Sequence, residues 1–218
     1  MGRSVHPVLV RVTHWAHAVL FAVMAGSGLQ ILIAFPLLGP RGEPYPWYPA
    51  QGVPPPAALT IGGWLAGARH WHFAFAWLFT ANAVAYLVYL FASGAWRERL
   101  FLPRRDARNA WQTVLHDLRL RREPPPSVGL YNGMQRLAYT GVLAIAAALV
   151  LSGLAIYKPV QLPRLTAALG GYDAARAIHL LGLAAVALFL VVHVVQVLRH
   201  PRTLVEMTAG RARRRDAA

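Results

Sequence analysis

Residues 177–198 read AIHLLGLAAVALFLVVHVVQVL and contain no Lys, Arg, Asp or Glu. A membrane-spanning helix needs about 20 predominantly apolar residues, so this stretch predicts one. Its two histidines, His179 and His193, are 14 residues apart. At 100° and ~1.5 Å per residue, both rings project from one helix face, about 21 Å apart along the axis. Because ionisable side chains inside a span are costly and usually functional, the stretch predicts one functional imidazole near each membrane surface.

Three further runs lack charged residues and are long enough to cross a bilayer. The chain is therefore expected to be an all-α membrane protein, a bundle of four transmembrane helices forming one domain over residues 1–218. The first span is expected to be retained rather than cleaved as a signal peptide, because it lacks a small-residue cleavage site. The predicted spans cover about 12–35, 70–94, 135–157 and 176–199, with an outer loop at 36–69, a basic inner loop at 97–134 and a basic tail at 200–218.

Composition and charge support this reading. Only 14% of residues are charged and 56% are hydrophobic, whereas a soluble domain carries about 25% charged residues. Seventeen of the 22 Lys and Arg residues fall on the side of the N-terminus. Since basic loops stay in the cytoplasm, this predicts an N-in, C-in topology. The net charge of +14 is then explained by that bias and by attraction to anionic membrane lipid, and no nucleic-acid partner is expected.

The loops carry weaker signals. The outer loop is rich in Pro, Trp and Tyr, which suit the headgroup level of a membrane. In the inner loop, residues 110–120 predict a short amphipathic segment, ended by the proline run at 124–126, whose Arg119, Arg121 and Arg122 would face lipid phosphates.

Absence of cysteine excludes disulfides, thiolate metal sites and covalently attached haem. Histidine is the remaining strong candidate for holding a cofactor. His14 begins the first span at the depth of His193, and His70 or His72 opens the second span at the depth of His179. The matching depths predict two b-type haems, each bound by two histidines in the bundle. Glycines 26, 28 and 153 would let a helix approach a neighbour or a porphyrin face closely.

Several motifs together resemble the bacterial di-haem cytochrome b family, which includes cytochrome b561-like proteins and the membrane subunits of formate dehydrogenase-N, nickel–iron hydrogenase and thiosulfate reductase. The similarity covers nearly the whole chain. Its carriers are RVTHW (11–15), SGLQI (27–31), RHWHFAFAWLF (69–79), YNGMQR (131–136), ARAIHLLG (175–182) and VVHVV (191–195).

The resemblance implies a role for each matched residue. It places haem-iron ligands at His14, His72, His179 and His193, paired His14/His193 and His72/His179, with His70 as the competitor of His72. His17 would lie behind a ligand or beside a quinone, and His6, His116 and His200 would be solvated. Asn132 and Gln135 would border a quinone pocket, because amides donate hydrogen bonds without adding charge; alternatively, Asn132 caps the third span.

Four arginines lie close to the ligands at the same membrane faces. Haem propionates need cationic partners, and the Arg guanidinium offers two parallel donors. The candidates are Arg11, Arg69, Arg136 and Arg176. Any of them could equally be a charge that sets the topology.

The implied function is a multi-pass cytochrome b of the bacterial inner membrane, passing electrons between the quinone pool and a periplasmic oxidoreductase. It would be an electron-transfer subunit of a respiratory complex, not the substrate-converting one, with a molybdopterin enzyme favoured over a hydrogenase as partner. The main rival is a stand-alone haem b quinone oxidoreductase acting on a small molecule such as superoxide at the outer face. A His-lined metal or proton transporter is a third reading, disfavoured because no Asp or Glu lies in a span.

Overall fold

The computed structural model describes residues 6–123, 125 and 131–210. Part of the predicted basic tail, from residue 211, and Pro124 and Pro126 of the proline run lie outside these residues.

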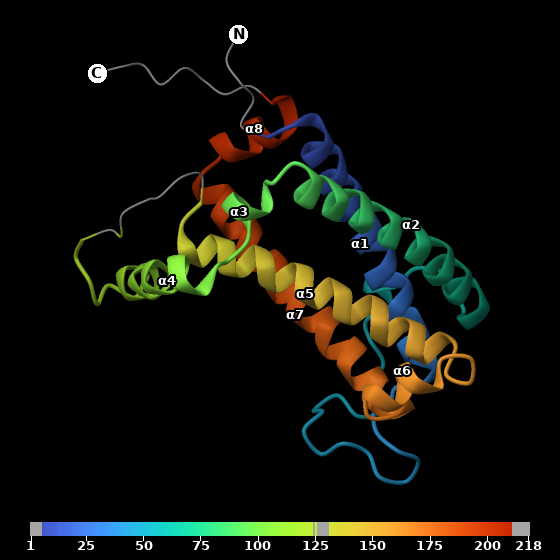
Figure 1. Ribbon diagram of the computed structural model, residues 1–218. Coiled ribbons are helices and arrows are strands. Elements are labelled where there is room, and N and C mark those ends of the chain that lie inside the picture. Colours follow the sequence, from blue (N-terminus) through green and yellow to red (C-terminus); the bar gives the residue numbers. More distant parts are fainter. Residues whose placement is uncertain (1–5, 124, 126–130, 211–218) are drawn as a thin grey trace.

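Four long helices correspond to the four predicted spans (Figure 1). They are α1 (Val8–Ala34), α2 (Leu65–Ala92), α5 (Gly133–Tyr157) and α7 (Tyr172–Arg199). Each is 25 to 28 residues long, enough to cross a hydrocarbon core of about 30 Å at ~1.5 Å per residue. The expected spans were two to four residues shorter, because the helices continue past the apolar core and carry Arg11, Arg69 and Arg199 within their end turns.

The long helices pack as two pairs, α1 with α2 and α5 with α7. We call the end of the molecule where α1 begins and α8 (Arg202–Ala209) lies the inner end, and the opposite end the outer end (Figure 1). Helix α8 is joined to the start of α1, because Arg11 donates to the Thr208 carbonyl at 2.8 Å and the Trp15 indole donates to the Met207 carbonyl at 3.3 Å.

At the inner end, α3 (Trp96–Arg99) leads into α4 (Pro103–Asp117), which packs on α5. Proline at the first position of α4 suits a helix start. The carboxylate of Asp106, 2% exposed, bridges to the buried Arg136 of α5 at 2.7 Å. Arg105 contacts the same carboxylate at 2.7 Å and holds the pKa of Asp106 well below its usual range.

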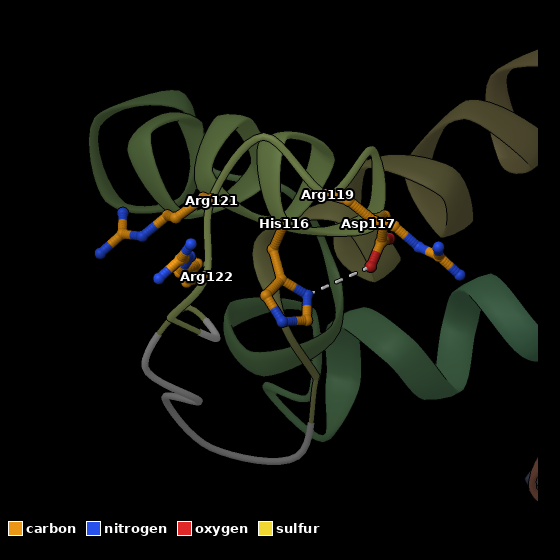
Figure 2. Close-up of a pocket in the computed structure, with 5 residues that line it drawn as sticks. All are labelled: His116, Asp117, Arg119, Arg121 and Arg122. Carbon is orange, nitrogen blue, oxygen red and sulfur yellow. Dashed lines mark ion pairs between the residues drawn. The ribbon is translucent and has the colours of Figure 1, made fainter.

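Compared with the amphipathic segment expected at 110–120, helix α4 begins earlier and also ends earlier. Helix α4 stops at Asp117, before the proline run, because Arg119 adopts a left-handed backbone with φ 60°. Figure 2 shows Arg121 and Arg122 on one side of this helix end and Arg119 pointing away from them. The three arginines form a spread basic surface at the inner end instead of converging on one anion.

At the outer end, the one regular element in the loop between α1 and α2 is the short 3₁₀ helix η1 (Ala57–Leu59). Helix α6 (Pro163–Ala168) links α5 to α7. The Gln51 side chain fastens the loop by bonding both polar backbone groups of Leu38 and the Tyr45 carbonyl, at 2.7–3.0 Å. Arg176 of α7 donates to the carbonyls of Phe35 and Leu37, so it joins the loop to the second helix pair.

The two helix pairs repeat one another in sequence as well as in arrangement. The pattern SGLxI occurs at 27–31 and at 152–156, and ARxxH occurs at 68–72 and at 175–179. Ser27 lies 19 residues after the first residue of α1, and Ser152 lies 19 residues after the first residue of α5. His72 and His179 each lie seven residues after the start of α2 and α7. Parallel repeats of this kind are common in membrane proteins.

Candidate haem-binding site

The outer layer of the site is a pair of imidazoles from equivalent positions of the two repeats. The ring centroids of His72 and His179 are 6.1 Å apart, with an angle of 68° between the planes. Two imidazoles bound to opposite sides of one metal at about 2 Å have ring centres about 6 Å apart. The pair is therefore spaced to bind one iron between its rings.

Each outer imidazole is held by a fully buried serine. The hydroxyl oxygens of Ser27 and Ser152 lie 3.0 Å from the Nδ1 atoms of His72 and His179. Each hydroxyl also lies 2.6 Å from the carbonyl four residues earlier, that of Val23 or Ala148. If the single hydroxyl proton goes to that carbonyl, the oxygen accepts from imidazole Nδ1–H. Nε2 is then the nitrogen left to bind a metal.

The glycine after each serine leaves the space that the imidazole occupies. A Cβ atom at Gly28 would lie 3.2 Å from Cε1 of His72, and one at Gly153 would lie 3.2 Å from Cε1 of His179. Gly26 has a different neighbour, since a Cβ there would meet Ile61 of the outer loop at 2.7 Å. Two of the three glycines noted in the sequence thus face a predicted ligand, and the third packs against the loop.

The inner layer is a second imidazole pair of the same spacing. His14 of α1 and His193 of α7 have ring centroids 6.0 Å apart and planes at 54°. His193 also stacks on Phe189 at 5.7 Å. Within the described residues, the buried Nδ1 of His14 has no hydrogen-bond partner. No cluster of three or more His, Cys, Asp or Glu that could hold a metal ion occurs in the described part of the chain, so these histidines meet two by two.

His70 and His17 point elsewhere. His70 is exposed and, with Arg69, Phe73 and Trp77, lines a shallow depression on the side of α2. The structure thus brings His72, and not His70, to His179. His17 lies against α2, where its Nδ1 contacts the Asn82 amide.

Of the three histidines expected to be solvated, two are exposed or partly exposed and one is buried. His200 is exposed and His116 is partly exposed beside Asp117. His6 contradicts the expectation, because it is only 8% exposed. Burial lowers its pKa, as do the nearby Arg99, His14 and Arg11. The sequence places His6 before a proline and the first span, where nothing indicates that the chain packs against the bundle.

The predicted quinone residues form the start of α5. The Asn132 side chain accepts a hydrogen bond from the Gln135 backbone at 2.8 Å, and the Gln135 side chain accepts one from the Asn132 backbone at 3.1 Å. This reciprocal pair is a capping box, so the helix-capping reading of Asn132 holds. The quinone role of both residues stays a prediction.

The four arginines considered for haem propionates all have interactions with other parts of the protein. Arg11 contacts α8, and Arg69 lies 5.5 Å above the Phe73 ring. Arg136 is buried in the Asp106 ion pair, and Arg176 bonds to the outer loop. The propionate role stays a prediction for each of them, and the ion pair gives Arg136 a separate structural role.

The serines are the site residues that sequence reasoning missed. The motif SGLQI was noted only as part of a resemblance, although SGLxI and ARxxH each occur twice. Aligning the first two spans with the last two shows that the two serines, like the two outer histidines, occupy equivalent positions.

Comparison with known proteins agrees with this geometry. Residues 5–210 match the family model of prokaryotic cytochrome b561. The chain is also 36% identical over 208 residues to a protein of Azospira oryzae described as "Putative protein-methionine-sulfoxide reductase subunit YedZ1", covering 95% of this chain and 96% of that protein.

The chain therefore belongs to the prokaryotic cytochrome b561 family, and the predicted resemblance is confirmed. Membership makes it a membrane electron-transfer protein of the b-haem-binding type. It is a multi-pass protein of the bacterial inner membrane, as the sequence predicted.

Proposed function

We propose that this chain binds two b-type haems and carries electrons across the inner membrane between quinol and an oxidoreductase at the outer face. The observation that carries the proposal is the presence of two imidazole pairs, with centroids 6.0 and 6.1 Å apart, near opposite ends of one bundle. Helix α7 supplies one ligand to each pair. His14 and His193 would hold the inner haem, and His72 and His179 the outer haem.

Haem iron supplies reversible one-electron chemistry when bound. The chain's own residues hold the imidazoles, exclude water and orient the ring nitrogens. Ser27 and Ser152 orient the outer pair through Nδ1. Such hydrogen bonds increase the basicity of a metal-binding imidazole and thereby lower the reduction potential of the iron.

For the orientation, we propose N-in and C-in. The basic surface after the end of α4 and the arginine-rich inner end then lie on the cytoplasmic side, where anionic lipid attracts them. The outer loop, joined to α7 by Arg176, then faces the periplasm together with the outer imidazole pair.

For the partner, we propose a periplasmic reductase of oxidised methionine in proteins, because the similar protein of Azospira oryzae is described as a putative subunit of such an enzyme. A molybdopterin enzyme remains favoured over a hydrogenase. Electrons would then flow from quinol at the inner layer to the partner at the outer layer.

The first test is the dithionite-reduced minus oxidised spectrum of the purified protein, with haem quantified per chain. Two b-type haems per chain are expected. One haem or none would overturn the two-layer assignment. Adding superoxide to the purified chain without a partner distinguishes the rival function, since rapid turnover of superoxide would favour a stand-alone enzyme.

A further inference from the structure

The internal repeat relates the inner imidazole pair to a second pair of residues at equivalent helix positions. His14 lies six residues after the start of α1, and the residue six after the start of α5 is Tyr139. His193 lies 21 residues after the start of α7, and the residue 21 after the start of α2 is Tyr86. Two histidines thus occupy one pair of inner positions, and two tyrosines occupy the equivalent pair.

These tyrosines belong to a connected cluster that includes Tyr131 and Arg99. The rings of Tyr131 and Tyr139 meet edge to face with centroids 5.1 Å apart. The Arg99 guanidinium donates to the Tyr131 hydroxyl at 3.4 Å, lies 5.9 Å from the centre of that ring, and is also near Tyr86. Three aromatic rings from α2, α5 and the segment before α5 therefore lie near one guanidinium.

The donors of this cluster are suited to a neutral acceptor. Burial raises the pKa of Tyr131 to about 12, so its hydroxyl stays protonated at neutral pH. Among the ion pairs within the described residues, none involves Arg99. A half-buried cation and protonated phenols can donate to a carbonyl oxygen, and aromatic faces can stack on a flat ring.

The cluster lies near the inner imidazole pair. His6 is buried at the inner end, and burial together with the nearby Arg99 and His14 lowers its pKa. Arg99 and the ligand His14 therefore have a common neighbour.

We propose that Tyr86, Tyr131, Tyr139 and Arg99 bind the quinone headgroup at the inner layer, with the guanidinium and a phenol donating to its carbonyl oxygens. This rests on the proposed function and deepens it. The side chains of Asn132 and Gln135 cap α5, so the contacts to the headgroup come from the tyrosine cluster beside them. Oxidation of one quinol releases two electrons and two protons. With haem held by the two imidazole pairs, the two electrons would pass one at a time to the haems, and the protons would go to water at the inner face.

The test uses the full-length, haem-loaded protein in lipid nanodiscs, with menadiol or a short-tailed ubiquinol as the electron donor. We expect Arg99→Gln to slow quinol-driven haem reduction at least tenfold and to weaken menadione binding by a similar factor. Tyr139→Phe is the conservative second variant, with an expected two- to tenfold effect. Haem content and the dithionite-reduced spectrum report whether each variant is intact. Tyr157→Phe, on the same helix at the outer end, is the matched control and should behave as the unmodified protein.

The outcomes separate the two proposals. Equal reduction rates and equal menadione binding in Arg99→Gln, Tyr139→Phe and the unmodified protein would overturn the tyrosine site and leave the proposed function standing. A slow rate in Asn132→Ala with normal rates in both cluster variants would assign the headgroup to the amides instead. If the unmodified di-haem protein neither binds menadione nor accepts electrons from either quinol, both the site and the quinone part of the proposed function fall.

Discussion

The outer and inner layers have almost the same imidazole spacing and reach it in different ways. The outer pair uses equivalent residues of the two repeats, His72 and His179, each with a buried serine at 3.0 Å and a glycine beside its ring. The inner pair uses non-equivalent residues, His14 and His193, which differ in their neighbours. Equal spacing therefore does not require equal surroundings, and the two layers are expected to differ in potential and in partner.

Removal of a ligand should have the largest effect and should separate the layers. His179→Ala should lose the outer haem and retain the inner one, because only the outer pair loses an imidazole. Haem quantification per chain and the reduced-minus-oxidised spectrum measure this. His200→Ala, an exposed histidine after the same helix, is the control. Retention of two haems in His179→Ala would refute the ligand assignment.

Loss of the buried ion pair should destabilise the inner end alone. Asp106→Asn leaves Arg136 buried without its carboxylate, which typically costs about 3–5 kcal/mol. Thermal unfolding and limited proteolysis of α4 would measure the loss, with Asp117→Asn as an exposed control. An unchanged melting temperature with α4 still protected would contradict this role of the pair.

The same pair predicts a pH dependence. Because Arg105 and Arg136 hold the folded-state pKa of Asp106 below that of an unfolded aspartate, which is about 3.9, the contribution is complete above that value. It is lost as the pH falls from about 4 through the folded-state pKa. Protection of α4 from an acid-active protease should therefore weaken only below about pH 4 in the unmodified protein. Asp106→Asn should show no such pH step.

Glycine substitutions should sharpen the comparison through sterics. Gly28→Ala and Gly153→Ala each place a Cβ atom 3.2 Å from an outer imidazole, so each should shift the outer-haem spectrum and reduce outer-haem occupancy. Gly141→Ala, whose Cβ has nothing within 4 Å, is the matched control and should stabilise α5 by about 0.5–1 kcal/mol. Identical spectra for all three variants would show that the outer ring has room to move.

Serine substitutions should have the smallest effect, equal for the two repeats. Ser27→Ala and Ser152→Ala each remove an acceptor from an outer imidazole Nδ1–H, a bond worth roughly 0.5–1.5 kcal/mol. The outer-haem midpoint potential should therefore rise by up to about 60 mV, the value for a tenfold change in a one-electron couple. Potentiometric titration should show the inner haem unchanged. A shift in the inner haem only, or opposite shifts for the two serines, would contradict the symmetric description.

Most of the fold could be predicted because hydropathy is a property of each helix alone. The four spans followed from charge-free runs, and the position of the two histidine rings on one face of α7 followed from the helical period. The end of α4 could not be predicted in this way, since it depends on a left-handed residue at Arg119. The burial of His6 likewise depends on packing against parts of the chain distant in sequence.

The sequence by itself determined that this chain crosses the membrane four times and presents one imidazole near each surface from a single helix. Its repeated SGLxI and ARxxH patterns also show that the serines and histidines of the outer layer occur at equivalent positions in the two halves of the chain. Only the tertiary structure decided that His72 and not His70 faces His179, that the buried serine hydroxyls contact the outer pair, and that Tyr139 and Tyr86 occupy the positions equivalent to His14 and His193. The reason is physical: the helical period fixes which residues share a face, but the rotation of each helix about its axis, set by packing against its neighbours, decides which faces meet.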